Sequence, residues 1–307
     1  MRGGKRWFRL GVSAPLVVLV VVFVLSNWNE LTESLGVIGR LPFAVFAVTL
    51  IFVCLTFALA AMSYRMLALR PLSFHELFTV ELAAACINRL VPSGIGGLGV
   101  HGLYLHRRKH TVAQATAVVS INNLLGMLVH VTLLTVLLLL LGNATGFHFT
   151  WGVSQTAISL GAAVLVGIML SMRSLRRRAH RFLCNLAASL ARYKKQPHML
   201  VFATLALLAL TLTNLLVLHL VANAVGVELE VTKLFIVYSA GVLVGAVVPT
   251  PGGLAGVEAG LVAGFIAYGV PAELAVAAAL AFRLATYWFP LVPGAIAFAV
   301  ARTKKLV

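Results

Sequence analysis

Acidic residues are few in this chain, and aspartate is absent altogether. The only acids are eight glutamates, against 24 lysines and arginines. Membrane enzymes that transfer a sugar or a lipid headgroup need an acidic pair that holds a metal, or a nucleophile beside a base. Most of the glutamates fall in segments assigned below to outer loops, so the sequence argues against an enzyme and predicts no catalytic residue.

Cysteine is scarce as well. The three cysteines, Cys54, Cys86 and Cys184, share no close spacing. They therefore predict neither a disulfide framework nor a metal motif, and we expect them to be small packing residues. His106 and His110 stand four residues apart but have no third ligand nearby. We predict no metal and no cofactor.

Charge of either sign is rare. Only 10% of the residues are charged and 61% are hydrophobic, and the mean hydropathy is +1.02. A soluble domain has about 45–50% apolar and about 25% charged residues. A water-soluble fold of 307 residues could not bury this much apolar surface. We therefore predict an integral membrane protein without a soluble domain.

The positive charge is gathered in short clusters between the apolar runs. The net charge is +16, and most of it lies at Arg2–Arg9, Arg65–Arg70, Arg107–Lys109, Arg173–Lys195 and Arg302–Lys305. This is the positive-inside pattern, which sets orientation and attracts anionic lipid headgroups. It places both termini in the cytoplasm, at the cell membrane. A nucleic-acid partner would require charge on one folded face with interleaved aromatics, and no such face exists.

Long apolar runs predict an all-α polytopic membrane protein. A spanning helix needs about 20 apolar residues. About six spanning helices are expected, the first of them an uncleaved anchor and the fourth a linking helix: Leu10–Ser26, Leu41–Tyr64, Thr111–Leu141, Trp151–Met172, Met199–Ala224 and Ala272–Val300.

Two further apolar segments are interrupted midway. Phe74–Leu105 has both ends beside basic clusters and is broken at Pro92–Gly97, whereas Lys233–Val270 has both ends outside and is broken at Pro249–Gly253. Proline and glycine disrupt helices, and broken backbone survives at membrane depth only when buried in protein or lining a wet cavity. Both segments are predicted to be re-entrant helical hairpins that enter from opposite sides.

The two breaks also align in sequence, Val91–His101 with Val248–Glu258. Each lies in a unit of span, hairpin and span, Leu41–Leu141 and Met199–Val300, and the two units insert in opposite directions. An inverted-topology repeat with broken helices is typical of transporters. The helix N-termini at the breaks favour an anionic group such as phosphate.

Few ionisable residues lie within the apolar runs, and a charged side chain there is energetically unfavourable unless it is paired. Arg283 is about ten residues into its predicted helix, which places it about 15 Å deep. Glu258 is its expected partner, and Tyr287 lies one turn later on the same face. These residues are predicted to line a translocation pathway. The alternative is that they form a structural pair that only fixes helix register.

In the first hairpin, Glu81 and Asn88 share a helix face, with Arg89 just before the break, and Asn123 lies in a polar stripe on the following span. Snorkelling to the cytoplasm or hydrogen bonding between helices is the alternative reading of these residues. The complete predicted pathway comprises Glu258, Arg283, Tyr287, Gly252, Gly253, Pro249, Pro251, Glu81, Asn88, Arg89, Pro92, Gly96, Gly97 and Asn123.

Two stretches near the C-terminus resemble a known family. Pro-Gly-Gly-Leu-Ala-Gly-Val-Glu at 251–258 and Ala-Phe-Arg-Leu-Ala-Thr-Tyr-Trp-Phe-Pro at 281–290 are similar to the lysylphosphatidylglycerol synthase transmembrane-region family. In the synthases this region moves an aminoacylated lipid to the outer leaflet, so the resemblance implies lipid movement. The chain ends shortly after its last predicted span, and we therefore expect no aminoacyl-transfer domain.

These observations favour a lipid flippase or scramblase for an anionic phospholipid or a polyprenyl-phosphate-linked lipid. One alternative is a non-transporting subunit that positions a lipid- or glycolipid-modifying enzyme; a membrane transferase is less favoured. The expected partners are membrane lipids with anionic headgroups. Association as a homo-oligomer, or with a lipid-modifying enzyme, stays open.

Overall fold

The computed structural model describes residues 42–91, 95–141, 196–248 and 252–307, together with seven isolated positions: Leu25, Trp28, Asn29, Thr32, Gly36, Tyr193 and Thr250. These residues form helices joined by turns, with no strand among them. Apart from Leu25, the predicted anchor helix lies outside the described residues. So do the linking helix 151–172 and the three prolines Pro92, Pro249 and Pro251.

Four helical runs are long and apolar enough to cross a membrane. They are α3 (Phe43–Leu67), α6 (Val112–Leu141), α9 (Pro197–Ala224) and the composite run Ala272–Thr303. Each coincides with a predicted span. The composite run consists of α12 (Ala272–Arg283), the π-helix η2 (Leu284–Trp288) and α13 (Leu291–Thr303). The sequence predicted one uninterrupted helix here and missed the π-helical turn.

Four shorter helices flank the two predicted breaks. The first pair is α4 (Phe74–Leu90) and α5 (Ile95–Arg107), and the second is α10 (Val231–Val247) and α11 (Gly256–Ala267). Val91 and Val248, which precede prolines, both have extended backbone angles. A proline clashes with a helical conformation of the residue before it, so each helix ends where its proline requires.

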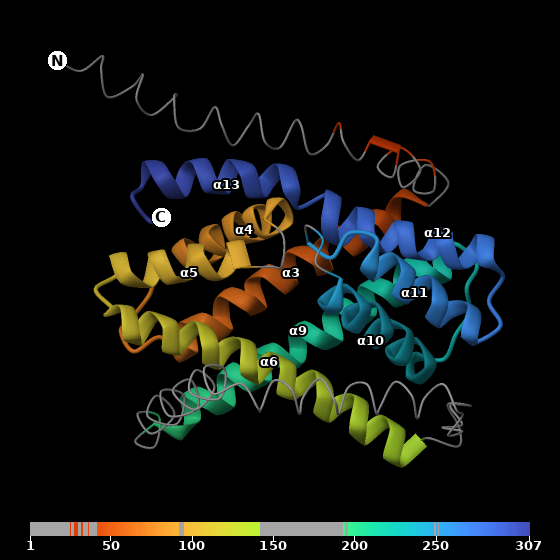
Figure 1. Cartoon of the computed structure of the whole chain (residues 1–307), viewed down its shortest axis with the longest axis horizontal. Coiled ribbons are helices and arrows are strands. Elements are labelled where there is room, and N and C mark those ends of the chain that lie inside the picture. The colour runs from red at the N-terminus through yellow and green to blue at the C-terminus, as the bar shows by residue number, and fades with distance from the viewer. Residues whose placement is uncertain are drawn as a thin grey trace, which may run out of the picture.

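Helix packing follows the same scheme in the two halves. In the first half α4 packs against α5, and both α3 and α5 contact α6; in the second half α10 packs against α11, and both α9 and α11 contact α12. Figure 1 shows α9 running alongside α3 and α13 lying along α4. The α3–α9 and α4–α13 contacts join the two halves.

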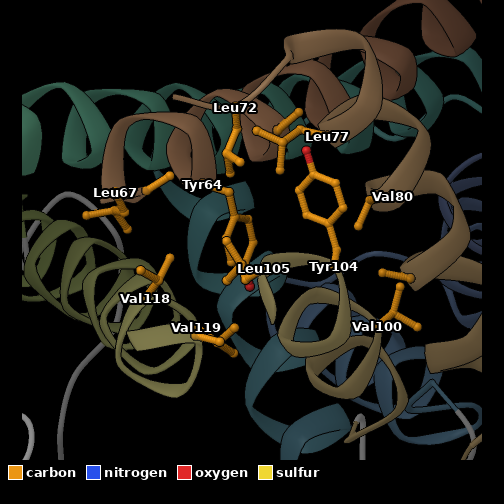
Figure 2. Packing of buried hydrophobic residues seen from close by; sticks show 14 of the residues in the cluster. Tyr64, Leu67, Leu72, Leu77, Val80, Val100, Tyr104, Leu105, Val118 and Val119 are labelled. Carbon is orange, nitrogen blue, oxygen red and sulfur yellow. The ribbon is translucent and has the colours of Figure 1, made fainter. Parts of the chain in front are cut away.

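Each half has its own apolar core, and a third cluster lies between them. In the first core the rings of Tyr64 and Tyr104 lie among aliphatic side chains of α3 to α6 (Figure 2). The second core gathers α9 to α12, with Phe265 fully buried. The third cluster joins α4 to the second break and to η2, and contains Cys86, Leu90, Leu254, Leu284, Tyr287, Trp288 and Leu291.

The long helices leave much apolar surface uncovered. Phe43 is 83% exposed and Leu139 is 79% exposed, at the ends of α3 and α6. Large contiguous apolar surface is unfavourable in water, whereas lipid covers it without penalty. The chain is a multi-pass membrane protein.

Candidate functional site

A buried ion pair joins the second hairpin to the last helical run. Arg283, the final residue of α12, donates from Nε to Oε1 of Glu258 in the first turn of α11. Only 6% of Arg283 is exposed. The pair matches the one expected from sequence. Nη2 of Arg283 and Oε2 of Glu258 are also buried, and within the described part of the chain neither has a hydrogen-bond partner.

A second arginine approaches the same place from the first half of the chain. Cζ of Arg283 lies 4.0 Å from the centroid of the Tyr287 ring, and Cζ of Arg89 lies 5.3 Å from it. The face of an aromatic ring attracts cations, more strongly where water is excluded. The carboxylate of Glu258 pairs with Arg283, and Arg89 adds a second guanidinium group beside the same ring, so these four side chains carry an excess positive charge.

Arg89 is bound to the helix of the other half. Its Nη1 donates to the carbonyl oxygen of Ala85 at 2.5 Å, and its Nη2 donates to that of Thr286 at 2.6 Å. In a regular helix the Thr286 carbonyl would accept from residue 290, but Pro290 has no N–H. The guanidinium of Arg89 supplies the missing donor. Because Pro290 leaves the Thr286 carbonyl without a backbone donor, this carbonyl can accept from Arg89 and so link the two halves of the chain.

The π-helical turn brings the cluster residues into this arrangement. Phe289 N donates to the carbonyl oxygen of Leu284 at 2.8 Å, a bond that spans five residues instead of four. Single π turns inside helices occur frequently at functional sites. Here the turn begins directly after Arg283 and contains both Thr286 and Tyr287.

The second break meets the same ring. Gly252 has a positive φ of 57°, and a Cβ at this position would lie 2.5 Å from Cε2 of Tyr287 and 3.3 Å from Cα of Arg89. Only glycine provides both the backbone angle and the space. Gly253, with a φ of 71°, continues the turn. The end of the first hairpin's α4 and the break of the second hairpin are therefore in contact through Tyr287.

The remaining predicted pathway residues of the first half that the structure describes, apart from Gly96, lie around a separate cavity. Glu81, Asn88, Gly97 and Asn123 line a cavity of about 260 Å³ between α3, α4, α5, α6 and α9. The structure thus separates Arg89 from the residues that the sequence grouped with it. Gly96 does not line the cavity; it lets α5 approach α4, because a Cβ there would lie 2.9 Å from the Ile87 carbonyl oxygen.

Asn88 connects the cavity to the first break. Its Oδ1 accepts a hydrogen bond from the backbone N–H of Gly97 at 3.3 Å. Gly97 lies in the first turn of α5, where N–H groups have no partner within the helix. Asn88 therefore acts as a cap from a neighbouring helix and holds the beginning of α5 against the end of α4.

Sequence reasoning missed His101. Its Nε2 lies 3.0 Å from Oε1 of Glu81, its Nδ1 lies 2.8 Å from the Gly97 carbonyl oxygen, and its ring stacks on Tyr64 at 4.2 Å. The alignment of the two breaks contained the signal, because it places His101 opposite Glu258. His101 is buried and Glu258 is partly buried, and each contacts an ionisable side chain of another helix. Asn122, which accepts from Ser63 at 2.7 Å, was missed in the same cavity.

No metal site stands out. Among the residues that the structure describes, no three His, Cys, Asp or Glu side chains are grouped to hold an ion. Nδ1 of His106 lies 3.2 Å from the backbone carbonyl oxygen of His110.

A family model matches most of the chain. No curated protein matches the sequence. The family described as "Lysylphosphatidylglycerol synthase TM region" matches residues 7–294, which is nearly the whole chain and includes the ion pair, Tyr287 and both breaks. The chain belongs to the lysylphosphatidylglycerol synthase TM region family.

Proposed function

We propose that this protein is a flippase or scramblase that moves an anionic phospholipid or a polyprenyl-phosphate-linked lipid across the cytoplasmic membrane. The observation that carries the proposal is the buried cluster of Arg89, Tyr287, Arg283 and Glu258, at the contact between two broken hairpins. Ionisable residues inside a membrane mark substrate pathways. Arginine is the side chain best suited to phosphate, since its planar fork donates two parallel hydrogen bonds.

Two buried N–H donors of the cluster are available for a phosphate. Nε of Arg89 and Nη2 of Arg283 are buried without a hydrogen-bond partner in the described chain. A buried donor left unpaired is unfavourable by about 1–3 kcal/mol. A phosphate provides acceptor oxygens and negative charge, so it would satisfy these donors and offset the excess positive charge.

An inverted repeat would explain how such a site serves both sides. The reciprocal packing of α3–α6 and α9–α12 supports a repeat, and the charge pattern supports opposite insertion of the two units. In this proposal six helices span the membrane, two hairpins are re-entrant, and both termini are cytoplasmic. Two oppositely inserted halves have two conformations of similar energy, one open to each side.

The test is lipid movement in liposomes made with purified protein and a tail-labelled anionic phospholipid. Externally added dithionite bleaches the outer leaflet only, so a moving lipid becomes fully accessible. We expect full bleaching with the wild type and with Arg107→Ala, a variant of an exposed arginine outside the cluster, and much slower bleaching with Arg283→Ala. Bleaching that stops at the level of protein-free liposomes would overturn the proposal.

The same preparation distinguishes the alternatives. Mass spectrometry of the recovered lipids would reveal a modified headgroup if the protein were a transferase. Neither movement nor modification would leave the role of a partner subunit, to be tested by co-purification with a lipid-modifying enzyme.

A further inference from the structure

The cavity beside the first break differs in chemistry from the arginine cluster, and we propose that it binds a hydroxyl-rich part of the lipid headgroup, a polyol or a sugar. This inference rests on the proposed function, because it assigns the phosphate of the same headgroup to Arg89 and Arg283. The two sites together would select a lipid with a phosphate next to several hydroxyl groups.

The cavity is large enough for such a group. Its volume is about 260 Å³, whereas one water molecule requires only about 10–15 Å³ of such space. A single ion would leave most of the cavity unfilled. Six side chains with polar atoms, from four helices, line it: Tyr64, Glu81, Asn88, His101, Asn122 and Asn123.

The charge of the lining disfavours a phosphate here. Among the described residues around the cavity there is no lysine or arginine to bind an anion, and the carboxylate of Glu81 disfavours one. Glu81 already has a partner, since its Oε1 lies 3.0 Å from Nε2 of His101. A cationic headgroup would therefore compete with His101 for this carboxylate, whereas a hydroxyl group can donate to its second oxygen and leave the imidazole in place. An uncharged polar group avoids both penalties.

The amides supply the complementary chemistry. An asparagine side chain offers two N–H donors and one acceptor oxygen. Asn88 uses its oxygen to cap Gly97, and no described residue accepts from its NH₂ group. Asn123 has no hydrogen-bond partner among the described residues and is exposed to the cavity. Hydroxyl groups both donate and accept, so a polyol can pair with these amides and with the carboxylate of Glu81.

The position of the cavity fits a headgroup that reaches both sites. Asn88 and Arg89 are consecutive, and their Cα atoms are about 3.8 Å apart. Asn88 lines the cavity, whereas Arg89 lies over the Tyr287 ring. The two sites therefore lie on adjacent faces of the last turn of α4.

The experiment compares three tail-labelled lipids with identical acyl chains in the liposome assay. Phosphatidylinositol carries a phosphate and a polyol, phosphatidic acid a phosphate alone, and phosphatidylethanolamine a phosphate and an amine. We expect the wild type to move phosphatidylinositol about tenfold faster than the other two, the gain from one or two neutral hydrogen bonds. Asn123→Leu should remove this preference, measured as the ratio of the phosphatidylinositol rate to the phosphatidic acid rate.

Two control variants separate the sites. Asn223→Leu changes an exposed asparagine on α9 that does not line the cavity, and it should leave all three rates unchanged. Arg283→Ala should slow phosphatidylinositol and phosphatidic acid alike. Equal wild-type rates for these two lipids, or a preference for phosphatidylethanolamine, would overturn the inference.

A binding measurement keeps the inference testable if no lipid moves at all, which would refute the proposed function. Soluble myo-inositol should then raise the Tm of the detergent-purified wild type, because a ligand that binds only the folded state stabilises it. The Tm of Asn123→Leu should not rise. An unchanged wild-type Tm in saturating myo-inositol would show that the cavity does not bind polyols.

Discussion

Arg89 and Arg283 come from opposite halves of the chain, yet their guanidinium groups approach the same ring, that of Tyr287, at 5.3 and 4.0 Å from its centroid. Two like charges beside one ring repel each other, and the repulsion is stronger in a medium of low dielectric constant. The ring face, the carboxylate of Glu258 and the Thr286 carbonyl offset that repulsion. The cluster therefore depends on each of its members.

The first prediction concerns the ion pair. Arg283→Ala and Glu258→Ala should each lower the free energy of unfolding by about 3–5 kcal/mol, because each leaves one buried charge uncompensated. The double variant should be more stable than the sum of the two losses implies. Thermal unfolding in detergent measures all three. Strictly additive losses would show that the two side chains do not interact.

The same variants test binding. If Arg283 also binds a headgroup phosphate, the double variant should regain stability but not lipid movement. Arg283→Lys keeps the charge but not the planar fork, so it should fold well and move lipid poorly. Full movement in the double variant would limit Arg283 and Glu258 to a structural role.

A second prediction separates the ring of Tyr287 from its hydroxyl group. The hydroxyl donates to the Arg89 carbonyl oxygen at 3.4 Å, which is a long hydrogen bond. Tyr287→Phe should therefore have little effect on stability. Tyr287→Leu removes the ring that both guanidinium groups contact and should cost about 2 kcal/mol or more, as expected for desolvated cation–π contacts. Equal effects of the two variants on thermal unfolding would contradict this assignment.

A third prediction uses two glycines with similar backbone angles. Gly226→Ala introduces a side chain at a φ of 89° with open space around it, so it should cost only about 1–2 kcal/mol in backbone strain. Gly252→Ala adds a clash with Tyr287 to the same strain. It should destabilise the protein clearly more and slow lipid movement. Gly253→Leu should likewise abolish movement while the protein still inserts. Similar unfolding temperatures for the two alanine variants would argue against close contact at the second break.

A fourth prediction fixes the orientation. Single cysteines are introduced at Arg107 and at Glu230 in a variant that lacks Cys54, Cys86 and Cys184; both new positions are exposed. A membrane-impermeant maleimide added to intact cells should label position 230 only. Label at position 107 from outside would exclude the re-entrant arrangement of α4 and α5.

A fifth prediction concerns His110, in the turn between α5 and α6 and outside the spanning segments. Burial lowers the pKa of His110 below its usual value, and the charge of Arg70 lowers it further. Between the two pKa values the unfolded chain binds more protons than the folded one, so stability is full above about pH 6.5 and falls below it.

The measurement is the Tm at pH 7.5 and at lower pH. His110→Gln should reduce the loss of Tm on acidification, whereas His75→Gln, at an exposed position, should leave it as in the wild type. An identical pH profile in His110→Gln and the wild type would contradict the assignment.

Much of the helical framework could be predicted from the sequence. The apolar runs gave four spans, and the prolines gave the ends of α4 and α10, because both signals act within a few residues of the chain. The pairing of Glu258 with Arg283 was also predictable, since an unpaired charge in an apolar setting is strongly destabilising and these two charges have opposite sign.

The remaining features depend on contacts between distant segments. Nothing local to Arg89 indicates that it binds the Thr286 carbonyl, although the free acceptor could have been recognised from Pro290. The π-helical turn was missed for the same reason, because packing against α4 and the second break, not helix propensity, determines it. His101 has no local signal at all and stands out only when the two breaks are compared.

The bond between Arg89 and the Thr286 carbonyl has a consequence for hydration. Since Pro290 cannot satisfy this carbonyl, any conformation in which α4 moves away from η2 leaves it without a donor, at about 1–3 kcal/mol, unless water takes the place of the guanidinium. A state with the hairpin ends apart is therefore a wet state at the level of Thr286. Entry of water there would accompany each passage between the two conformations, and water-accessible labels beside Thr286 would report it.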